Sequence, residues 1–336
     1  MVTMKDVARN AGLSLYTVSK VLNGHASVRE GTRLKVLQAC EALGYERNPH
    51  AVNLVSRKTT TIGMIVSHIT NPFYGEIIEA AEREARRRGY NLVYQCSYLD
   101  ATIEASIIRH FQALRVCGLV IAPVVTSANR ALLERAEEAF PVVYVDRYFS
   151  PDCSYVVNDN IASACLATNH LIERGTSPAY LGSIRSSLNP ALLDRESGYR
   201  RAMEAKGLVP TLIPPENSAA ERDNELFGYE NMRAFLVSTP PPSGLFCAND
   251  SVAIGAMRAL SERGLAIGKD VLVVGHDNIS YTAYLNPPLT TVEQPKKEMG
   301  EGAVTLLANL SGDEERDTPT QRVLQSRLCI RASTGG

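Results

Sequence analysis

The chain has 336 residues, 45% of them hydrophobic, which is enough for a large core and more than one typical domain holds. Its formal net charge is −1, yet residues 1–58 carry nine Lys and Arg against four Asp and Glu, a local charge of +5. A basic N-terminal part on an acidic remainder favours a phosphate-binding module joined to a part that does not bind nucleic acid.

Composition also excludes several classes of protein. The sequence has neither a run of eighteen apolar residues nor an apolar secretory segment, so we expect no membrane span, no export and a cytoplasmic location. Seven scattered cysteines without a CxxC pair favour reduced, buried thiols over a disulfide framework or a zinc site.

Residues 4–22 predict two short helices joined by a tight turn. Thr3 and Asp6 form a capping pair at the start of the first helix, and Gly12 is placed to end it. Ser14 is a good N-cap for the second helix. The predicted apolar face of the first helix consists of Met4, Val7, Ala8 and Ala11.

The second helix is expected to point Val18 and Val21 inward and to expose an arc of roughly 140°. Two small helices around a Gly turn, the second exposing polar groups, are the layout of a helix-turn-helix that reads DNA. A helical hairpin that binds nothing is the alternative, and the local positive charge favours the DNA reader. The exposed arc consists of Leu15, Tyr16, Ser19 and Lys20.

A third helix is predicted over residues 32–43, with Gly44 ending it. We expect its buried face to hold Val36, Leu37, Cys40 and Leu43. Residues 48–56 follow with an N-cap and a proline at the first helical position, but two turns of helix are unstable alone in water. On spacing alone this segment is interpreted as a linker, and polar residues 57–61 mark a boundary.

From residue 61 short apolar runs alternate with helical stretches. Runs of this kind predict strands buried on both faces of parallel sheets, and the remaining length of about 270 residues accommodates two such sheets. The predicted strands lie at 62–66, 91–94, 118–121, 142–145, 179–182, 244–247 and 271–274.

Ligands in such folds bind at the C-terminal ends of the strands. The segments at those ends hold carboxylates, amides, an arginine and aromatic rings, which together suit a polyhydroxylated ligand. Two alternatives stay open: Asn249 or Asp250 could simply cap the following helix, and Phe73 and Tyr74 could be interface core.

The sequence contains no catalytic motif. No GxGxxG follows the first strand, and P-loop, HExxH and GxSxG patterns are lacking. His276 and Asp277 are adjacent but do not have metal-ligand spacing, and a lone histidine at a strand end is commonly structural. We expect no catalytic residue, no metal and no cofactor.

Over nearly its full length the chain resembles the lactose-repressor (LacI) family of bacterial transcription regulators. The resemblance implies a small all-α helix-turn-helix headpiece on an α/β core of two subdomains with parallel sheets, similar to periplasmic binding proteins. The matching blocks include Lys5-Asp-Val-Ala8, Thr17 to Gly24, Asn48-Pro49, Asn71-Pro-Phe-Tyr74, Val145-Asp-Arg147, Arg195-x-x-Gly-Tyr199, Ala248-Asn-Asp250 and Thr291-Val-Glu-Gln294.

The resemblance assigns the DNA-contacting positions. It implies base readout by residues 15, 16 and 20, where Lys20 replaces the usual arginine and acts on guanine as a point charge. It also turns the linker into a hinge that folds on the operator and wedges Leu54 into the minor groove. The full set is Thr3, Ser14, Leu15, Tyr16, Thr17, Ser19, Lys20, Asn23, Ala51 and Leu54.

The resemblance also implies boundaries and an effector site. We expect a DNA-binding domain at 1–47, a hinge and linker at 48–60 and a core at 61–336. One subdomain would comprise about 61–160 and 291–320, and the other about 161–290 and 321–333. Asn189 and Ala191 argue against a purine, so a sugar, sugar acid or sugar phosphate is the expected effector. The expected cleft residues are Phe73, Tyr74, Asp146, Arg147, Arg195, Asn249, Asp277 and Gln294.

Function and assembly follow from these expectations. The chain should be a nucleoid-associated repressor whose effector shifts how the subdomains close. Because only five residues follow Arg331, we expect no tetramer-forming tail. We expect a homodimer that binds a pseudo-palindromic operator. One alternative is a solute-binding protein, but it would leave residues 1–58 unexplained. The other alternative is a sugar-processing enzyme, which would require that the purified protein turns over a candidate effector.

Overall fold

The computed structural model describes residues 2–22, 27–45, 59–183, 189–215, 223–311 and 319–335. The chain divides into two units, Met1–Thr59 and Thr60–Gly336, each with its own hydrophobic core. Asn23, Ala51 and Leu54, three of the expected DNA-contacting residues, lie outside the described residues, as does nearly all of the expected hinge at 48–60.

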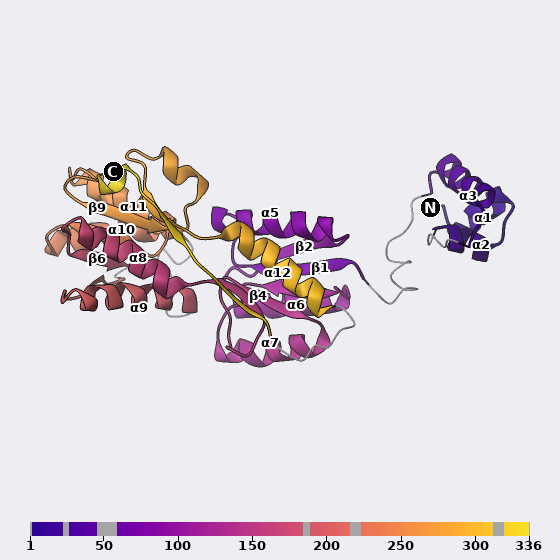
Figure 1. Ribbon diagram of the computed structural model, residues 1–336, viewed down its shortest axis with the longest axis horizontal. Coiled ribbons are helices and arrows are strands. Elements are labelled where there is room, and N and C mark those ends of the chain that lie inside the picture. The colour runs from indigo at the N-terminus through magenta and orange to yellow at the C-terminus, as the bar shows by residue number, and fades with distance from the viewer. Residues whose placement is uncertain are drawn as a thin grey trace. The chain divides into compact units, whose positions relative to one another are not determined.

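The first unit contains the three predicted helices, α1 (Met4–Ala11), α2 (Leu15–Leu22) and α3 (Glu30–Leu43), which are labelled in Figure 1. Both the backbone N–H and the hydroxyl of Thr3 donate to the Asp6 carboxylate at the start of α1, at 3.0 and 2.6 Å. Gly12 ends α1 in the left-handed region at φ 65°. These local contacts confirm the predicted capping pair and stop signal.

The three helices share a core that includes Val7, Val18 and Val21, as predicted. The prediction for α3 was wrong in two respects. The helix begins two residues early, at Glu30, and Leu37 is half exposed, while Ala39 is buried beside Val36. Ala39 is three residues after Val36 and lies on the same face of the helix, whereas Leu37, one residue after Val36, points away from that face.

The second unit contains two six-stranded sheets. The first sheet has the order β11-β5-β4-β3-β1-β2, and the second has the order β12-β10-β9-β8-β6-β7. All pairs are parallel except β10 with β12. The strands are β1 (Thr61–Val66), β2 (Asn91–Cys96), β3 (Gly118–Ile121), β4 (Val142–Val145), β5 (Tyr155–Asn158), β6 (Pro178–Leu181), β7 (Thr211–Ile213), β8 (Gly244–Cys247), β9 (Leu272–His276), β10 (Thr290–Glu293), β11 (Gln321–Leu324) and β12 (Arg327–Cys329).

Helices connect these strands, as the alternating pattern predicted. In Figure 1 the yellow α12 lies beside the purple α5, and Gly300 at their contact leaves no room for a Cβ against the Ile77 carbonyl. The helices of this unit are α5 (Pro72–Arg87), α6 (Ala101–Ala113), α7 (Ser127–Ala139), α8 (Asn160–Glu173), α9 (Pro190–Ala205), α10 (Asn224–Ser238), α11 (Asp250–Glu262) and α12 (Lys296–Leu310), with 3-10 turns η2 (Ser280–Tyr284) and η3 (Ala332–Thr334).

We call the first sheet with its helices subdomain one and the second sheet with its helices subdomain two. The chain passes between them three times, at crossover one (residues 158–160), crossover two (294–296) and crossover three (325–326). The boundaries expected at 291 and 321 need correction. β10 pairs with β9 in the second sheet, and β11 pairs with β5 in the first, so the passages fall after these strands and not before them.

β2 also departs from the prediction of strands buried on both faces. Most of its residues are at least partly exposed, with Val93 at 39% and Tyr94 at 42%, because β2 is the edge strand of the first sheet. By contrast β3, β4, β6 and β8 are buried throughout, as their apolar runs predicted, and so is β5, which was not predicted. The edge leaves an apolar strand without a neighbour within the described part of this chain.

Candidate functional site

A cleft of about 150 Å³ lies between the C-terminal ends of the strands in the two subdomains. Loops after β1 and β4 supply one wall, and the starts of α9, α10 and α11 and the end of β9 supply the other. The lining residues are Ser67, His68, Thr70, Asn71, Phe73, Tyr74, Leu99, Asp146, Arg147, Ser183, Asn189, Leu192, Arg195, Asn224, Glu225, Asn249, Ser251 and Asp277.

Of the eight expected cleft residues, Gln294 alone is not at the cleft surface. It is buried behind Asp277 and donates from Nε2 to Asp277 Oδ1 at 2.7 Å. The residues that line the cleft are Phe73, Tyr74, Asp146, Arg147, Arg195, Asn249 and Asp277. Seven of the residues expected from the resemblance therefore line the cleft, and the eighth, Gln294, holds Asp277 in place from behind.

Arg147 has all five guanidinium N–H groups engaged. Nε donates to the Pro123 carbonyl at 2.6 Å, Nη1 donates to the Tyr74 hydroxyl and the Asp146 carboxylate, and Nη2 donates to the Ser67 hydroxyl and the Ala122 carbonyl. Burial disfavours its charge, but Tyr74 and Asp146 raise the pKa of Arg147 above its usual value. A saturated guanidinium of this kind holds the cleft wall together and has no donor left for a ligand.

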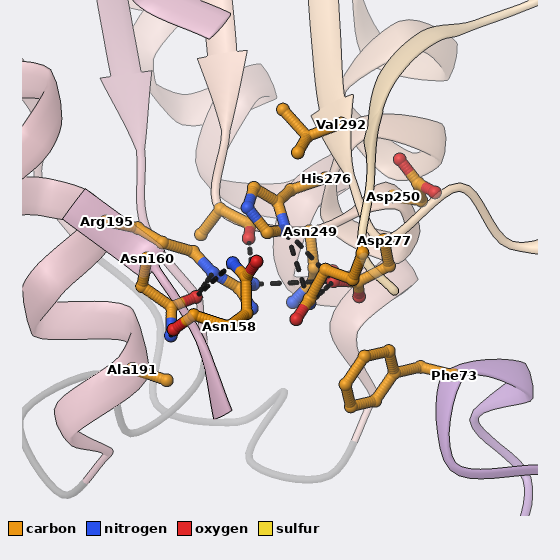
Figure 2. Close-up of polar contacts among 12 residues, drawn as sticks. Phe73, Asn158, Asn160, Ala191, Arg195, Asn249, Asp250, His276, Asp277 and Val292 are labelled. Carbon is orange, nitrogen blue, oxygen red and sulfur yellow. Dashed lines mark hydrogen bonds and ion pairs between the residues drawn. The ribbon is translucent and has the colours of Figure 1, made fainter. Parts of the chain in front are cut away.

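Tyr74 belongs to the same cluster. Its hydroxyl donates to Asp146 Oδ2 at 2.8 Å, and burial raises its pKa to about 12. Phe73 is nearly edge-on to this ring, with centroids 5.0 Å apart, and it faces the cleft from α5 (Figure 2). Asn71 positions both rings, because its side chain caps α5 by accepting from the Phe73 N–H at 3.0 Å.

Each subdomain places one aspartate directly after a central strand in the left-handed backbone region. Asp146 follows β4 at φ 67°, and Asp277 follows β9 at φ 118°. Such conformations cost of order 1–3 kcal/mol in residues other than glycine and concentrate at functional sites. Here the turn points a carboxylate into the cleft from either side.

Arg195 and Asp277 form the polar centre of the wall from subdomain two. Arg195 Nη1 lies 3.5 Å from Asp277 Oδ1 and donates to the Ala248 carbonyl at 2.7 Å, while Nε donates to Asn160 Oδ1 (Figure 2). Burial raises the pKa of Asp277, but Arg195 and the hydrogen bond from His276 outweigh it and hold the pKa below its usual value. The carboxylate is therefore ionised at neutral pH.

Asn249 both caps a helix and lines the cleft. Its Oδ1 accepts from the Val252 N–H at 2.9 Å at the start of α11, and its Nδ2 donates to Ser183 Oγ at 3.0 Å. Capping by Asn249 was one of the two open alternatives, and it does not remove the residue from the cleft. Asp250 is fully buried and accepts from Thr291 and Ile279, and burial together with the charge of Asp277 raises its pKa.

Sequence reasoning missed the wall contributed by α10. Asn224 accepts from Ser183 Oγ at 2.7 Å, and Glu225 accepts from Ser251 Oγ at 2.6 Å, so both line the cleft beside Asn249. The strand before α10, β7, was not predicted, so nothing in the sequence placed the start of α10 at this edge of the sheet, where β7 pairs with β6.

The second helix of the first unit presents the predicted arc. Tyr16 is 69% exposed, and the Lys20 ammonium lies 4.7 Å from the centroid of its ring, a cation–π contact. Ser14 Oγ accepts from the Thr17 N–H at 3.1 Å and lies 2.8 Å from the Thr17 hydroxyl, which confirms the predicted N-cap. Leu15 is exposed at 43%, a solvent-facing leucine at the start of a short helix.

The described residues contain no group of His, Cys, Asp and Glu side chains placed to hold a metal ion. Within the same residues no helix has both the length and the apolar character needed to cross a membrane.

Comparison with known proteins agrees with both units. Residues 3–48 match the sequence profile of bacterial regulatory proteins of the lacI family, and residues 168–334 match that of the periplasmic binding protein-like domain. The HTH-type transcriptional regulator RegA of Clostridium saccharobutylicum is 35% identical over 335 residues, 99% of either chain. The ribose operon repressor of Escherichia coli is 35% identical over 313 residues, 91% of this chain and 92% of its own.

A solved structure gives the same result. The lac repressor dimer bound to operator and the anti-inducer ONPF superposes with a TM-score of 0.89 at 26% identity, covering 99% of both chains. The chain belongs to the LacI family of bacterial transcription regulators. It is a DNA-binding regulator with a helix-turn-helix unit and a two-subdomain α/β core, and its relatives are regulators and repressors and not enzymes.

Proposed function

We propose that this regulator is a dimeric repressor that binds a pseudo-palindromic operator and is controlled by a small polyhydroxylated effector in the cleft. The observation that carries the proposal is the ionised Asp277 beside Arg195 at a cleft that both subdomains line. A ligand that touches both walls binds one arrangement of the subdomains better than another, which is the thermodynamic requirement for control. A regulator of this kind works in the cytoplasm, at the nucleoid.

The DNA contacts come from α2 and its neighbours. We assign base readout to Leu15, Tyr16 and Lys20, whose side chains are grouped on the exposed face of α2, and phosphate contacts to the remaining positions. The hinge from residue 48 to 60 with its Leu54 wedge rests on the sequence resemblance. The phosphate-contacting and hinge positions are Thr3, Ser14, Thr17, Ser19, Asn23, Ala51 and Leu54.

The polar groups of the cleft favour a neutral sugar over a sugar acid or phosphate. Asp277 Oδ1 receives all the contacts from Arg195, His276 and Gln294, which leaves Oδ2 to accept from ligand hydroxyls. Arg147, which would suit an anion, has its five N–H groups occupied by the protein. Phe73 offers a ring face to the C–H side of a sugar. The ribose operon repressor, a relative of similar length, supports a sugar.

A homodimer is supported by the open edge of the first sheet and by the lac repressor dimer that this chain resembles. Tyr94 and Val93 expose apolar surface on that edge strand, and such edges are ordinarily covered by another element. Tyr94→Glu should convert the protein to a monomer in analytical ultracentrifugation, while Tyr284→Glu, on an exposed 3-10 turn of subdomain two, serves as the comparison.

The experiment that tests the effector is a thermal-unfolding screen of the purified protein against neutral pentoses, hexoses and disaccharides, sugar acids, sugar phosphates and nucleobases. A ligand present at a hundred times its Kd adds about 2.7 kcal/mol to the stability of the state it binds, a shift of a few degrees. Stabilisation by neutral sugars alone, lost in Arg195→Gln, supports the proposal. Stabilisation only by nucleobases or anions contradicts it.

A further inference from the structure

His276 does not line the cleft, and the function proposed above assigns it no contact with the effector; it bonds Asp277, which does line the cleft. It is the last residue of β9, its side chain is fully buried, and Figure 2 shows its ring between Asp277 on one side and Asn158 and Asn160 on the other. His276 Nδ1 lies 3.1 Å from Asp277 Oδ1, and Nε2 lies 3.0 Å from Ser163 Oγ.

The direction of these hydrogen bonds follows from the groups themselves. The ionised Asp277 carboxylate can only accept, so His276 carries its proton on Nδ1 and accepts at Nε2 from the Ser163 hydroxyl. That hydroxyl also lies 3.1 Å from the Asn160 carbonyl, but donation there would leave a buried Nε2 without a donor. Burial and the charge of Arg195 lower the pKa of His276 to about 4, which keeps the ring neutral.

Beyond Ser163 the chain of hydrogen bonds reaches two crossovers. Asn158 Nδ2 donates to Ser163 Oγ at 3.2 Å, and Asn158 Oδ1 accepts from Ser326 Oγ at 2.6 Å. Asn158 belongs to crossover one and Ser326 to crossover three, and the Asp159 N–H ties the same two segments by donating to the Leu324 carbonyl at 2.9 Å. Crossover two reaches Asp277 directly, through Gln294.

We propose that His276 is a positioning residue that couples Asp277 in the cleft to crossovers one and three. A contact that the effector makes with Asp277 then changes the hydrogen bonds at the segments that join the two subdomains. This inference rests on the proposed effector site. Asn158, Ser163, His276 and Asp277 are each at most 5% exposed, so the hydrogen bonds among them are largely shielded from water. Asp277 also has a backbone φ of 118°, a strained conformation for a residue other than glycine.

The test is native-state hydrogen exchange of the full-length protein without effector or operator. Asp277→Asn serves as the perturbation in the cleft, and the reporters are the amides of Asp159, Ser163 and Lys296, all hydrogen-bonded. We expect Asp277→Asn to change exchange at all three by about fivefold or more. Lys296 should respond in every background, because Gln294 Nε2 donates directly to Asp277 at 2.7 Å and lies farther, at 3.4 Å, from His276 Nδ1.

His276→Gln and His276→Asn interrupt the chain at opposite ends. The glutamine amide reaches the position of Nε2 and retains Ser163, whereas the asparagine amide occupies the position of Nδ1 and retains Asp277. In either background Asp277→Asn should leave exchange at Asp159 and Ser163 unchanged while still altering Lys296. A merely structural histidine would give additive effects.

The matched control is His170→Asn. His170 is a second buried histidine of subdomain two, bonded through Nε2 to Thr334 Oγ1 at 3.0 Å, away from the crossovers. In that background the response of Asp159 and Ser163 to Asp277→Asn should persist. If the response also persists undiminished in both His276 variants, Arg195 and Asn160 carry the coupling and the proposal is overturned. Because no sugar is used, this outcome is independent of the effector screen.

Discussion

Arg147 Nη1 lies 2.7 Å from Asp146 Oδ2 in an ion pair that is almost completely removed from solvent. The two residues are adjacent in sequence, and the left-handed backbone of Asp146 turns both side chains into the same cluster with Tyr74. A buried pair of this kind adds little over apolar packing while intact, but the loss of one partner leaves a charge without compensation.

Arg147→Met should therefore lower the free energy of unfolding by about 3 kcal/mol, because Asp146 and the carbonyls of Pro123 and Ala122 lose their donor. Urea denaturation followed by circular dichroism measures the change. Arg130→Met removes an exposed pair with Glu134 and should cost less than about 0.5 kcal/mol. Equal losses in the two variants would show that Arg147 does not hold the cleft wall.

Lys20→Ala should weaken operator binding about tenfold and relax the preference at one base pair of each half-site. Lys20 is held over the exposed ring of Tyr16, so its ammonium is presented on the face that we assign to the major groove. Selection of operators from random duplexes, followed by fluorescence anisotropy, measures both effects. Lys269→Ala, a substitution on the core, is the control, and unchanged base preference in Lys20→Ala would refute the assignment.

Leu54→Ala should lower the affinity for the same operator by about tenfold without changing the thermal midpoint of the core. Leu54 is the proposed apolar wedge of the hinge, and alanine is too short to keep a base step unstacked. Leu54→Met retains a long apolar side chain and should bind nearly as well as the parent protein. Gel-shift measurement of DNA bending separates this loss from a loss of base contacts, and undiminished bending by Leu54→Ala would exclude the wedge.

Local signals in the sequence were sufficient to predict the three helices of the first unit. The capping pair of Thr3 and Asp6, the stop at Gly12 and the N-cap at Ser14 act within a few residues, and each is found where expected. Apolar runs likewise located seven strands, because a strand buried on both faces is a short continuous apolar run. The strands that were not predicted are β5, β7, β10, β11 and β12.

Sheet order was not contained in those local signals. β10 and β11 have similar lengths and lie on either side of α12, so nothing local indicates that β10 completes the second sheet and β11 the first. The exposure of β2 has the same origin, since it depends on the position of the strand in the sheet. The sheet to which a strand belongs and its exposure both depend on pairing between strands that are far apart in the sequence, and a local sequence pattern does not contain that information.

The cleft shows the same division. The resemblance located Arg195 within a motif and Asp277 by its position, whereas Asn224 and Glu225 lie in a stretch without a motif and were missed. Residue type alone could not reveal that Arg147 is saturated. That conclusion needs the carbonyls of Pro123 and Ala122, which no side-chain pattern records.

Glu104 provides a prediction about pH that is independent of the effector. It is fully buried on α6, where its carboxylate accepts from the Val124 N–H at 2.9 Å and from Asn129 Nδ2 at 2.6 Å. Burial raises the pKa of Glu104 to about 7 despite these donors. The folded state therefore holds a proton that the unfolded state releases near the ordinary value of 4.5.

Because the folded state binds the extra proton, the contribution of Glu104 to stability is present below its unfolded pKa and is lost as pH rises to about 7. The total loss is about 3 kcal/mol, since a shift of one pKa unit corresponds to about 1.4 kcal/mol. His276 acts in the opposite sense, because its lowered pKa makes stability rise between about 4 and 6.5. Above about pH 6.5 this opposition ends, and Asp250, whose pKa burial raises to about 8, then acts in the same sense as Glu104.

Glu104→Gln isolates the effect. The amide keeps the size of the side chain and an oxygen that accepts from Val124, but it does not titrate. The difference in free energy of unfolding between the parent and Glu104→Gln, measured by urea denaturation from pH 5 to 8, should move in favour of the variant as pH rises. His276 and Asp250 contribute equally to both proteins and cancel in this difference. A difference that stays constant over the whole range would mean that Glu104 is already ionised in the folded protein at pH 5.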